Sequence, residues 1–195
     1  MKWSRAKLGE IIELKYGKSL PKKSRDGGEY AVYGSNGKVG SHSKALTEGP
    51  TIIVGRKGSF GEVNYSPEPC SPIDTTYYID EFNGLEVGFV ERMLGQLPLK
   101  SLNRSSAIPG LNREDAYGCE VSIAPLNEQR RIVTKLEACE TRIDAAREAL
   151  DDVPALLEQY RQSVLAAAFC GDLTREWRES NPDVEPASEL LERLH

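Results

Sequence analysis

The chain has 195 residues, 39% of them apolar and 28% charged, with a formal net charge of −5. These values are typical of a globular protein, and the apolar runs are too short to span a bilayer, so we expect no membrane partner. The charge is uneven, because residues 1–66 carry a balance of +6, residues 67–125 of −5 and residues 126–195 of −6. A basic first third on an acidic protein allows a localised anionic partner, nucleic acid included.

Residues 1–125 combine many glycines with short apolar runs between turn residues. Four of these runs predict strands, at residues 30–33, 51–54, 75–79 and 119–123. Residues 85–97 predict a helix, with Val87, Val90 and Leu94 on one face. We therefore expect an α+β fold: one domain over residues 1–125, with a mixed sheet and long polar loops.

Residues 126–171 predict one long helix. Glycine is absent from Asn127 until Gly171, and apolar residues recur in alternating steps of 4 and 3. This a/d heptad pattern defines a stripe, called the seam below. The seam comprises Ile132, Leu136, Cys139, Ile143, Ala146, Leu150, Val153, Leu157, Tyr160, Val164 and Ala167. Asn127 is the expected N-cap and Gly171 the expected stop, which gives a helix of roughly 64 Å.

Pro154 lies inside this pattern and allows two interpretations: a kink in one helix, or a second helix that begins at the proline. The apolar register continues unchanged across Pro154, which favours one kinked helix. So long a seam needs a partner helix, from the tail of this chain, a second copy or another protein. The alternative is a helix packed along its own domain. Residues 172–195 form a tail, in which residues 187–195 predict a short helix with Ser188 as a possible cap.

The sequence lacks the residues that several kinds of active site require. His42 is the one histidine before the last residue, and we interpret it as a polar loop residue rather than a catalytic base. The glycine loop 55–61 does not match a phosphate-binding motif. Asp183 and Glu185 superficially resemble the carboxylates of a metal-dependent nuclease, but no lysine follows to complete such a site, so we interpret them as a surface turn.

The four cysteines contain no CxxC pair, which argues against structural zinc and favours reduced thiols. The N-terminus has charges but no apolar segment of the signal-peptide type. We therefore expect no metal, no cofactor and a cytoplasmic protein.

Basic and polar loops at strand ends are the remaining candidates for function. Arginine and asparagine can read bases, while lysine, serine and backbone amides hold phosphates. The alternative is a set of ordinary solvated turns. The candidate DNA contacts are Lys22, Lys23, Arg25, Tyr33, Ser35, Asn36, Arg56, Lys57, Ser59, Asn103 and Arg104.

The resemblance of this sequence to a known family depends on seven stretches and on their order along the chain. They are residues 7–11, 33–37, 53–61, 108–112, 124–133, 153–157 and 164–177. The most specific is Ala124-Pro-Leu-Asn-Glu-Gln-Arg-Arg-Ile-Val133, where the globular region enters the long helix. This order resembles the specificity (S) subunit of type I restriction–modification systems over nearly the whole chain.

The resemblance implies a non-catalytic subunit that binds double-stranded DNA. A full-length S subunit is similar to two tandem copies of this arrangement. Each target-recognition domain reads one half of a bipartite site, and the two helices form an antiparallel coiled coil. That coiled coil docks methyltransferase (M) subunits and, through them, the restriction (R) subunit. The assembled complex methylates adenine or cleaves DNA.

This sequence has one domain and one helix, which implies either a half-subunit that dimerises or part of a longer chain. The expected segments are a target-recognition domain over 1–125, a coiled-coil helix over 126–171 and a tail over 172–195. The expected partner interface comprises Ile132, Leu136, Cys139, Ile143, Leu150, Leu157, Tyr160 and Val164. Two other functions stay open: a metal-dependent nuclease, and an assembly protein that has lost DNA recognition.

Overall fold

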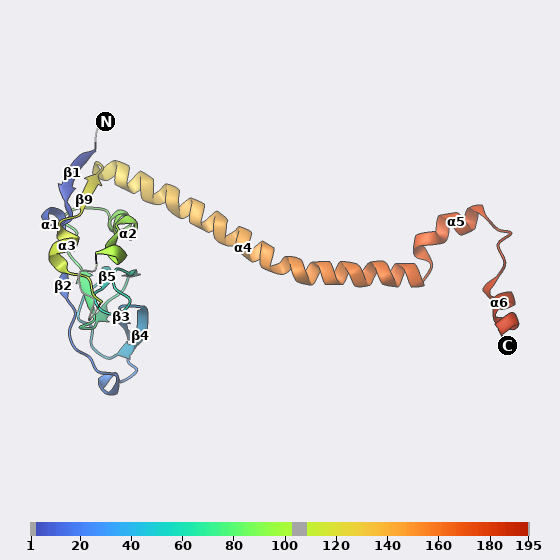
Figure 1. Cartoon of the computed structure of the whole chain (residues 1–195), viewed down its shortest axis with the longest axis horizontal. Coiled ribbons are helices and arrows are strands. Elements are labelled where there is room, and N and C mark those ends of the chain that lie inside the picture. Colours follow the sequence, from blue (N-terminus) through green and yellow to red (C-terminus); the bar gives the residue numbers. More distant parts are fainter. Residues whose placement is uncertain (1–2, 103–108, 195) are drawn as a thin grey trace. The chain divides into compact units, whose positions relative to one another are not determined.

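The computed structural model describes residues 3–102 and 109–194 (Figure 1). The chain divides into two compact units, of which the first ends at Glu137 and the second begins at Ala138. The first unit contains three small sheets. β1 (Ser4–Lys7) pairs with β9 (Glu120–Ile123) antiparallel. A four-stranded antiparallel sheet has the order β2 (Lys15–Tyr16), β8 (Thr76–Ile79), β5 (Thr51–Gly55), β6 (Val63–Ser66). The third sheet has the order β4 (Gly37–His42), β3 (Tyr30–Gly34), β7 (Cys70–Pro72), with β3 and β7 parallel.

Short helices complete this unit. They are α1 (Leu8–Ile11), α2 (Val87–Gln96), α3 (Arg113–Tyr117), and the 3₁₀ turns η1 (Lys22–Ser24) and η2 (Leu99–Ser101). The core lies between β5 and α2, where Ile52 and Val54 join Val90 and Leu94. Every residue of β5 is buried, as its unbroken apolar sequence predicts.

The sequence-based expectations for this unit are largely confirmed. The four expected strands and the helix exist, and one of the three sheets, β4–β3–β7, is mixed, so the α+β fold class is correct. β1, β2, β6, β7, α1 and α3 were not predicted, because these elements have two to five residues and show no complete period. The loop assignment of His42 is wrong, because this residue ends β4, with its Nδ1 atom 3.1 Å from Asp26 Oδ1.

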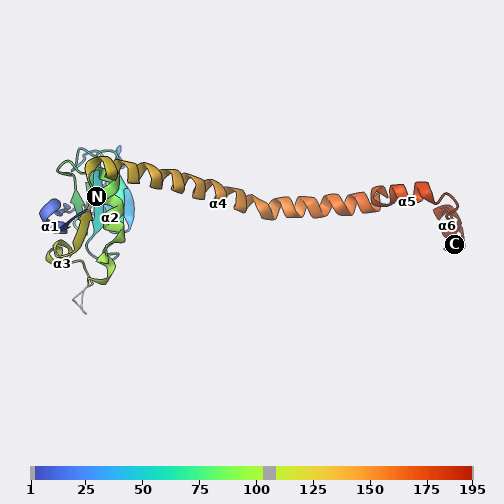
Figure 2. The same ribbon diagram turned by 90° about the horizontal axis from the view of Figure 1, so that it is seen from above.

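The long helix, α4, extends without interruption from Leu126 to Phe169, as Figure 2 shows. It continues through Pro154, so the alternative with a second helix at the proline is wrong. Asn127 is not the N-cap but lies in the first turn. The helix begins two residues earlier than a cap at Asn127 predicts, because the Pro125 carbonyl accepts the N–H groups of Glu128 (2.8 Å) and Gln129 (3.0 Å).

The C-terminal end of α4 is as expected. Gly171 has a φ of +79°, the left-handed conformation in which glycine ends helices. Then follow η3 (Asp172–Thr174), α5 (Arg175–Ser180) and α6 (Ala187–Leu194). Ser188 lies inside α6 rather than capping it, because Glu189 N donates to the Pro186 carbonyl (3.1 Å). None of the helices in the described part of the chain combines the length and the apolar character needed to cross a membrane.

The seam of α4 is exposed. Val133, beside the seam, packs with Phe89 and Ala124. Further along, the exposed fraction reaches 67% at Leu150 and 69% at Tyr160. The globular unit therefore covers only the start of the seam, where Ile132 packs beside Val133, and from Leu136 to Val164 the large apolar seam residues are exposed among the described residues.

Candidate nucleic-acid interface

Two of the predicted loops meet at one backbone carbonyl, that of Thr75. It accepts the N–H groups of Arg56 (2.9 Å) and Lys57 (3.1 Å), and the hydroxyl of Ser35 donates to it (2.5 Å). The turn between β3 and β4 and the loop after β5 are thereby held together. Gly55 makes this loop possible, because a Cβ at Gly55 would lie 2.2 Å from the Ser59 carbonyl oxygen.

The tip of the β3–β4 hairpin is a two-residue turn, Ser35-Asn36, closed by the pairing of Gly34 with Gly37. Gly37 has a φ of +97°, which favours glycine at this position. Ser35 is buried, whereas Asn36 is exposed. The turn therefore presents asparagine to solvent and uses serine to hold its position.

Arg56 lies in a group of aromatic and cationic side chains, called the Arg–Tyr cluster below. The cluster comprises Tyr16, Tyr77, Tyr117, Arg56 and Arg113. The Arg56 guanidinium lies 5.2 Å from the Tyr16 ring centroid and 5.8 Å from that of Tyr77, and its Nη2 donates to the Asp74 carbonyl (2.7 Å). Arg113 lies 5.3 Å from the Tyr16 centroid and 5.7 Å from that of Tyr117.

Tyr77 is the buried member of the cluster. Burial raises the pKa of Tyr77 to about 12, although the charges of Arg56 and Arg113 act to lower it. Its hydroxyl donates to the Leu111 carbonyl (3.2 Å). Tyr77 therefore stays neutral at physiological pH, and the cluster keeps its net positive charge.

The segment before β3 is fixed by Arg25 and Asp26. Arg25 donates to the carbonyls of Leu20 (3.2 Å) and Val39 (2.9 Å), so its guanidinium has a structural role. The Ser43 hydroxyl and the N–H groups of Gly28 and Ser43 hold the pKa of the Asp26 carboxyl well below its usual range.

The structure places the predicted contacts in three groups. Five are exposed to solvent: Lys22, Lys23, Asn36, Lys57 and Ser59. Four are partly or fully buried: Arg25, Tyr33, Ser35 and Arg56. The last two, Asn103 and Arg104, lie outside the described residues. Tyr16 and Arg113 were not among the predicted contacts, because nothing in the sequence shows that residues 97 positions apart meet.

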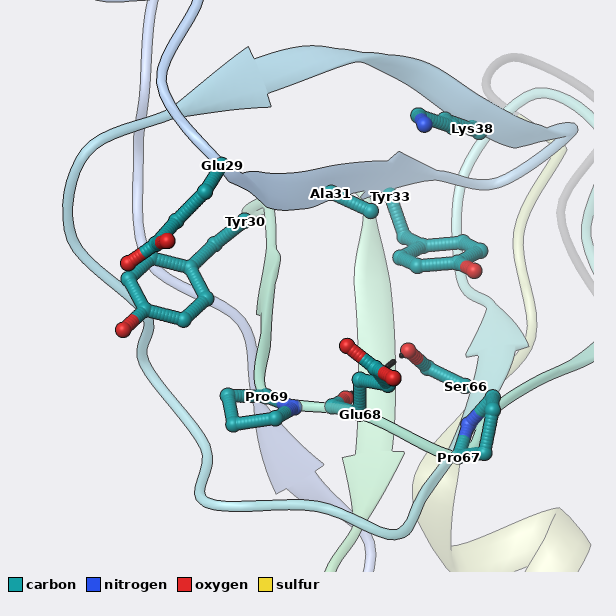
Figure 3. A pocket seen from close by; sticks show the side chains of 9 residues that line it. All are labelled: Glu29, Tyr30, Ala31, Tyr33, Lys38, Ser66, Pro67, Glu68 and Pro69. Atoms are coloured by element: carbon teal, nitrogen blue, oxygen red, sulfur yellow. Dashed lines mark hydrogen bonds between the residues drawn. The ribbon is translucent and has the colours of Figure 1, made fainter.

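A pocket of about 340 Å³ opens beside β3 (Figure 3). Tyr33 and Lys38 lie on one side of it and Glu29 and Tyr30 on the other, with Glu68 at a third wall. Hydrogen bonding to Glu29 raises the pKa of Tyr30. The two carboxylates disfavour a DNA phosphate here, so Tyr33 faces a different environment from Lys57.

Comparison with known proteins identifies the family. The family model described as "Type I restriction modification DNA specificity domain" matches residues 1–153, the globular unit and more than half of α4. The chain belongs to this family. Among relatives of this DNA specificity family, the type I restriction enzyme EcoDI specificity subunit of Escherichia coli is 27% identical over 181 residues. That alignment covers 92% of this chain and 40% of the relative.

Solved structures show the same fold as this specificity-domain chain. The S subunit of the type I restriction–modification system of M. genitalium superposes with a TM-score of 0.65 at 21% identity, over 92% of this chain and 50% of that one. The HsdS subunit of Thermoanaerobacter tengcongensis superposes with a TM-score of 0.62 at 19% identity, over 88% and 46%. The chain thus spans about half the length of these structures.

Proposed function

We propose that this chain is the DNA-recognition part of a type I restriction–modification complex and has no catalytic role of its own. Residues 1–125 would read one half of a bipartite site, α4 would dock a methyltransferase subunit, and residues 172–195 would form a tail. The observation that carries the proposal is the family match over residues 1–153, which includes both the loop-bearing unit and the start of the seam.

The loops around Thr75 support DNA binding by this unit. Lys57 and Ser59 are exposed beside the exposed Asn36, and hydrogen bonds fix the backbone beneath them. Lysine, serine and asparagine side chains on a rigid scaffold are the groups that contact phosphates and base edges.

Lys57→Ala is expected to weaken binding to all DNA sequences alike. The salt dependence of binding, plotted as log K against log [salt], should fall in slope by about one, because one phosphate contact is lost. Fluorescence anisotropy with duplexes at several salt concentrations measures this. Lys7→Ala, which removes an exposed lysine of β1, is the matched control and should leave the slope unchanged. A slope for Lys57→Ala equal to that of the control would contradict this assignment.

The sizes of the seam residues support pairing with an antiparallel second copy. Between Cys139 and Tyr160, the small side chains Cys139 and Ala146 precede Leu150, whereas the bulky Leu157 and Tyr160 follow it. A parallel, in-register pair would place each seam residue against its own copy, which leaves gaps at the small residues and crowds the tyrosines. An antiparallel pair centred near Leu150 places Cys139 near Tyr160 and Ala146 near Val153, in each case a smaller side chain against a larger one.

Disulfide cross-linking distinguishes the two orientations. In a Cys170→Ser background, the substitutions Leu157→Cys, Tyr160→Cys and Val164→Cys are made one at a time. Antiparallel pairing predicts an oxidised dimer through Cys139 in at least one of these variants, and none in the parent, because a disulfide needs closely placed Cβ atoms. An oxidised dimer that forms through Cys139 in the parent indicates the parallel orientation and contradicts the proposal.

A map of DNA methylation tests the whole proposal. The chain is co-expressed with a type I methyltransferase subunit from the same organism in a host without DNA methylation, and the modified bases are sequenced. Methylated adenines in an interrupted palindrome are expected, since two identical copies read two identical half-sites. A complex that forms without modifying DNA would instead indicate an assembly protein without recognition.

A further inference from the structure

The Arg–Tyr cluster holds two cations at one exposed tyrosine. The guanidinium groups of Arg56 and Arg113 both lie within 5.3 Å of the Tyr16 ring centroid, and Tyr16 is 51% exposed. Tyr16 belongs to β2, Arg56 follows β5 and Arg113 begins α3. Three separate parts of the sequence are therefore folded to bring two positive charges close to one aromatic ring.

These two charges are weakly compensated. The charged neighbour of Arg113 among the described residues is Glu114, whose carboxylate lies 3.8 Å away and is itself largely exposed. Arg56 donates to a neutral acceptor, the Asp74 carbonyl, and its buried Nε atom has no partner within the described part of the chain. Two guanidinium groups near one ring both favour an anion close to them, and such an anion would offset the repulsion between their charges.

The cluster is rigid, because its parts are joined by backbone bonds. Leu111 N donates to the Arg56 carbonyl (2.9 Å), and Lys57 and Gly110 form a β-bridge. Asn112 caps α3 directly before Arg113, its Oδ1 accepting the N–H of Glu114 (2.8 Å). The backbone segments that carry the two arginines are thus held together, and the tyrosine rings pack against the guanidinium groups.

We propose that Arg56 and Arg113, supported by Tyr16, form a binding site for one phosphate of the DNA backbone. This inference rests on the proposed function and adds to it a contact that orients the DNA rather than reading its sequence. Guanidinium groups suit this role because their paired N–H donors match the oxygens of a phosphate. The site lies directly beside the exposed Lys57, so this site and Lys57 would contact the same stretch of the DNA backbone.

Arg113→Ala in the full chain tests the proposal, because Arg113 contributes less to the packed core than Arg56. Binding is measured with a mixed-sequence duplex over a range of salt concentrations and with a random-sequence library. We expect about tenfold weaker binding at 0.1 M salt and a slope reduced by about one, with the same ranking of library sequences. Arg113→Lys should keep the slope, because it keeps the charge. Arg5→Ala, on exposed β1, is the matched control, and thermal unfolding confirms that each variant is folded.

The outcomes separate this inference from the proposed function. If the unmodified chain binds no DNA, both are overturned. If it binds DNA and Arg113→Ala binds as the control does, the phosphate site alone is overturned. If Arg113→Ala changes which library sequences are preferred, Arg113 contacts a base, and the phosphate assignment is again overturned.

Discussion

Leu150→Asp is expected to abolish pairing of α4 with its partner helix while leaving residues 1–137 folded. Leu150 lies at the middle of the seam and is 67% exposed in the single chain. Pairing would bury it, and a carboxylate in that position without a partner charge costs several kcal/mol. Light scattering after size-exclusion chromatography measures the loss of the dimer, and co-purification measures the loss of the methyltransferase subunit.

Ala155→Asp is the matched control for this experiment. It introduces the same charge five residues later, at an exposed position outside the heptad seam. This variant should assemble normally. Normal assembly of Leu150→Asp would show that the seam is not the interface, whatever the control does.

Gln129→Met is expected to destabilise the globular unit by about 2 to 4 kcal/mol. The Gln129 side chain is 1% exposed, and it donates to the Ala124 carbonyl (2.7 Å) and accepts the N–H of Glu86 (2.9 Å). It therefore joins the end of β9 to the start of α2. Methionine keeps the volume but leaves both backbone groups buried without a partner, and urea denaturation measures the cost.

Gln162→Met on the exposed part of α4 makes the same chemical change outside the core. It should alter the unfolding free energy by less than about 0.5 kcal/mol. If Gln129→Met shows so small a change, the two side-chain hydrogen bonds do not stabilise the junction between β9 and α2.

The sequence predicted the features that depend on local pattern. β5 was predicted because Thr51–Val54 is an unbroken apolar and β-branched run, and α4 was predicted through Pro154 because its heptad register does not slip there. The alternating patterns that fix these elements need no information about distant residues.

Features that depend on tertiary contacts were not predictable in this way. Ser35 and Asn36 are equivalent in the sequence as polar turn residues, yet the Thr75 carbonyl holds Ser35 inside and leaves Asn36 outside. Arg113 meets Tyr16 across 97 residues of sequence. Such tertiary partners decide whether a loop side chain points inward or outward. The positions of the loops could therefore be predicted from the sequence, but the roles of their individual side chains could not.

In the two loops that meet at the Thr75 carbonyl, some residues fix the backbone and others expose their side chains, and this separation affects how DNA specificity can change during evolution. Gly55, Ser35 and the backbone of Arg56 fix the loop, whereas the exposed side chains of Asn36, Lys57 and Ser59 make no hydrogen bond to the core in the described structure. Substitution of an exposed residue that packs against little typically changes stability by no more than about 0.5 kcal/mol. New side chains can therefore be sampled at these three positions without loss of the fold. Under the proposed function, a substitution at a base-contacting position such as Asn36 would change the recognition sequence, whereas one at Lys57 would change affinity alone.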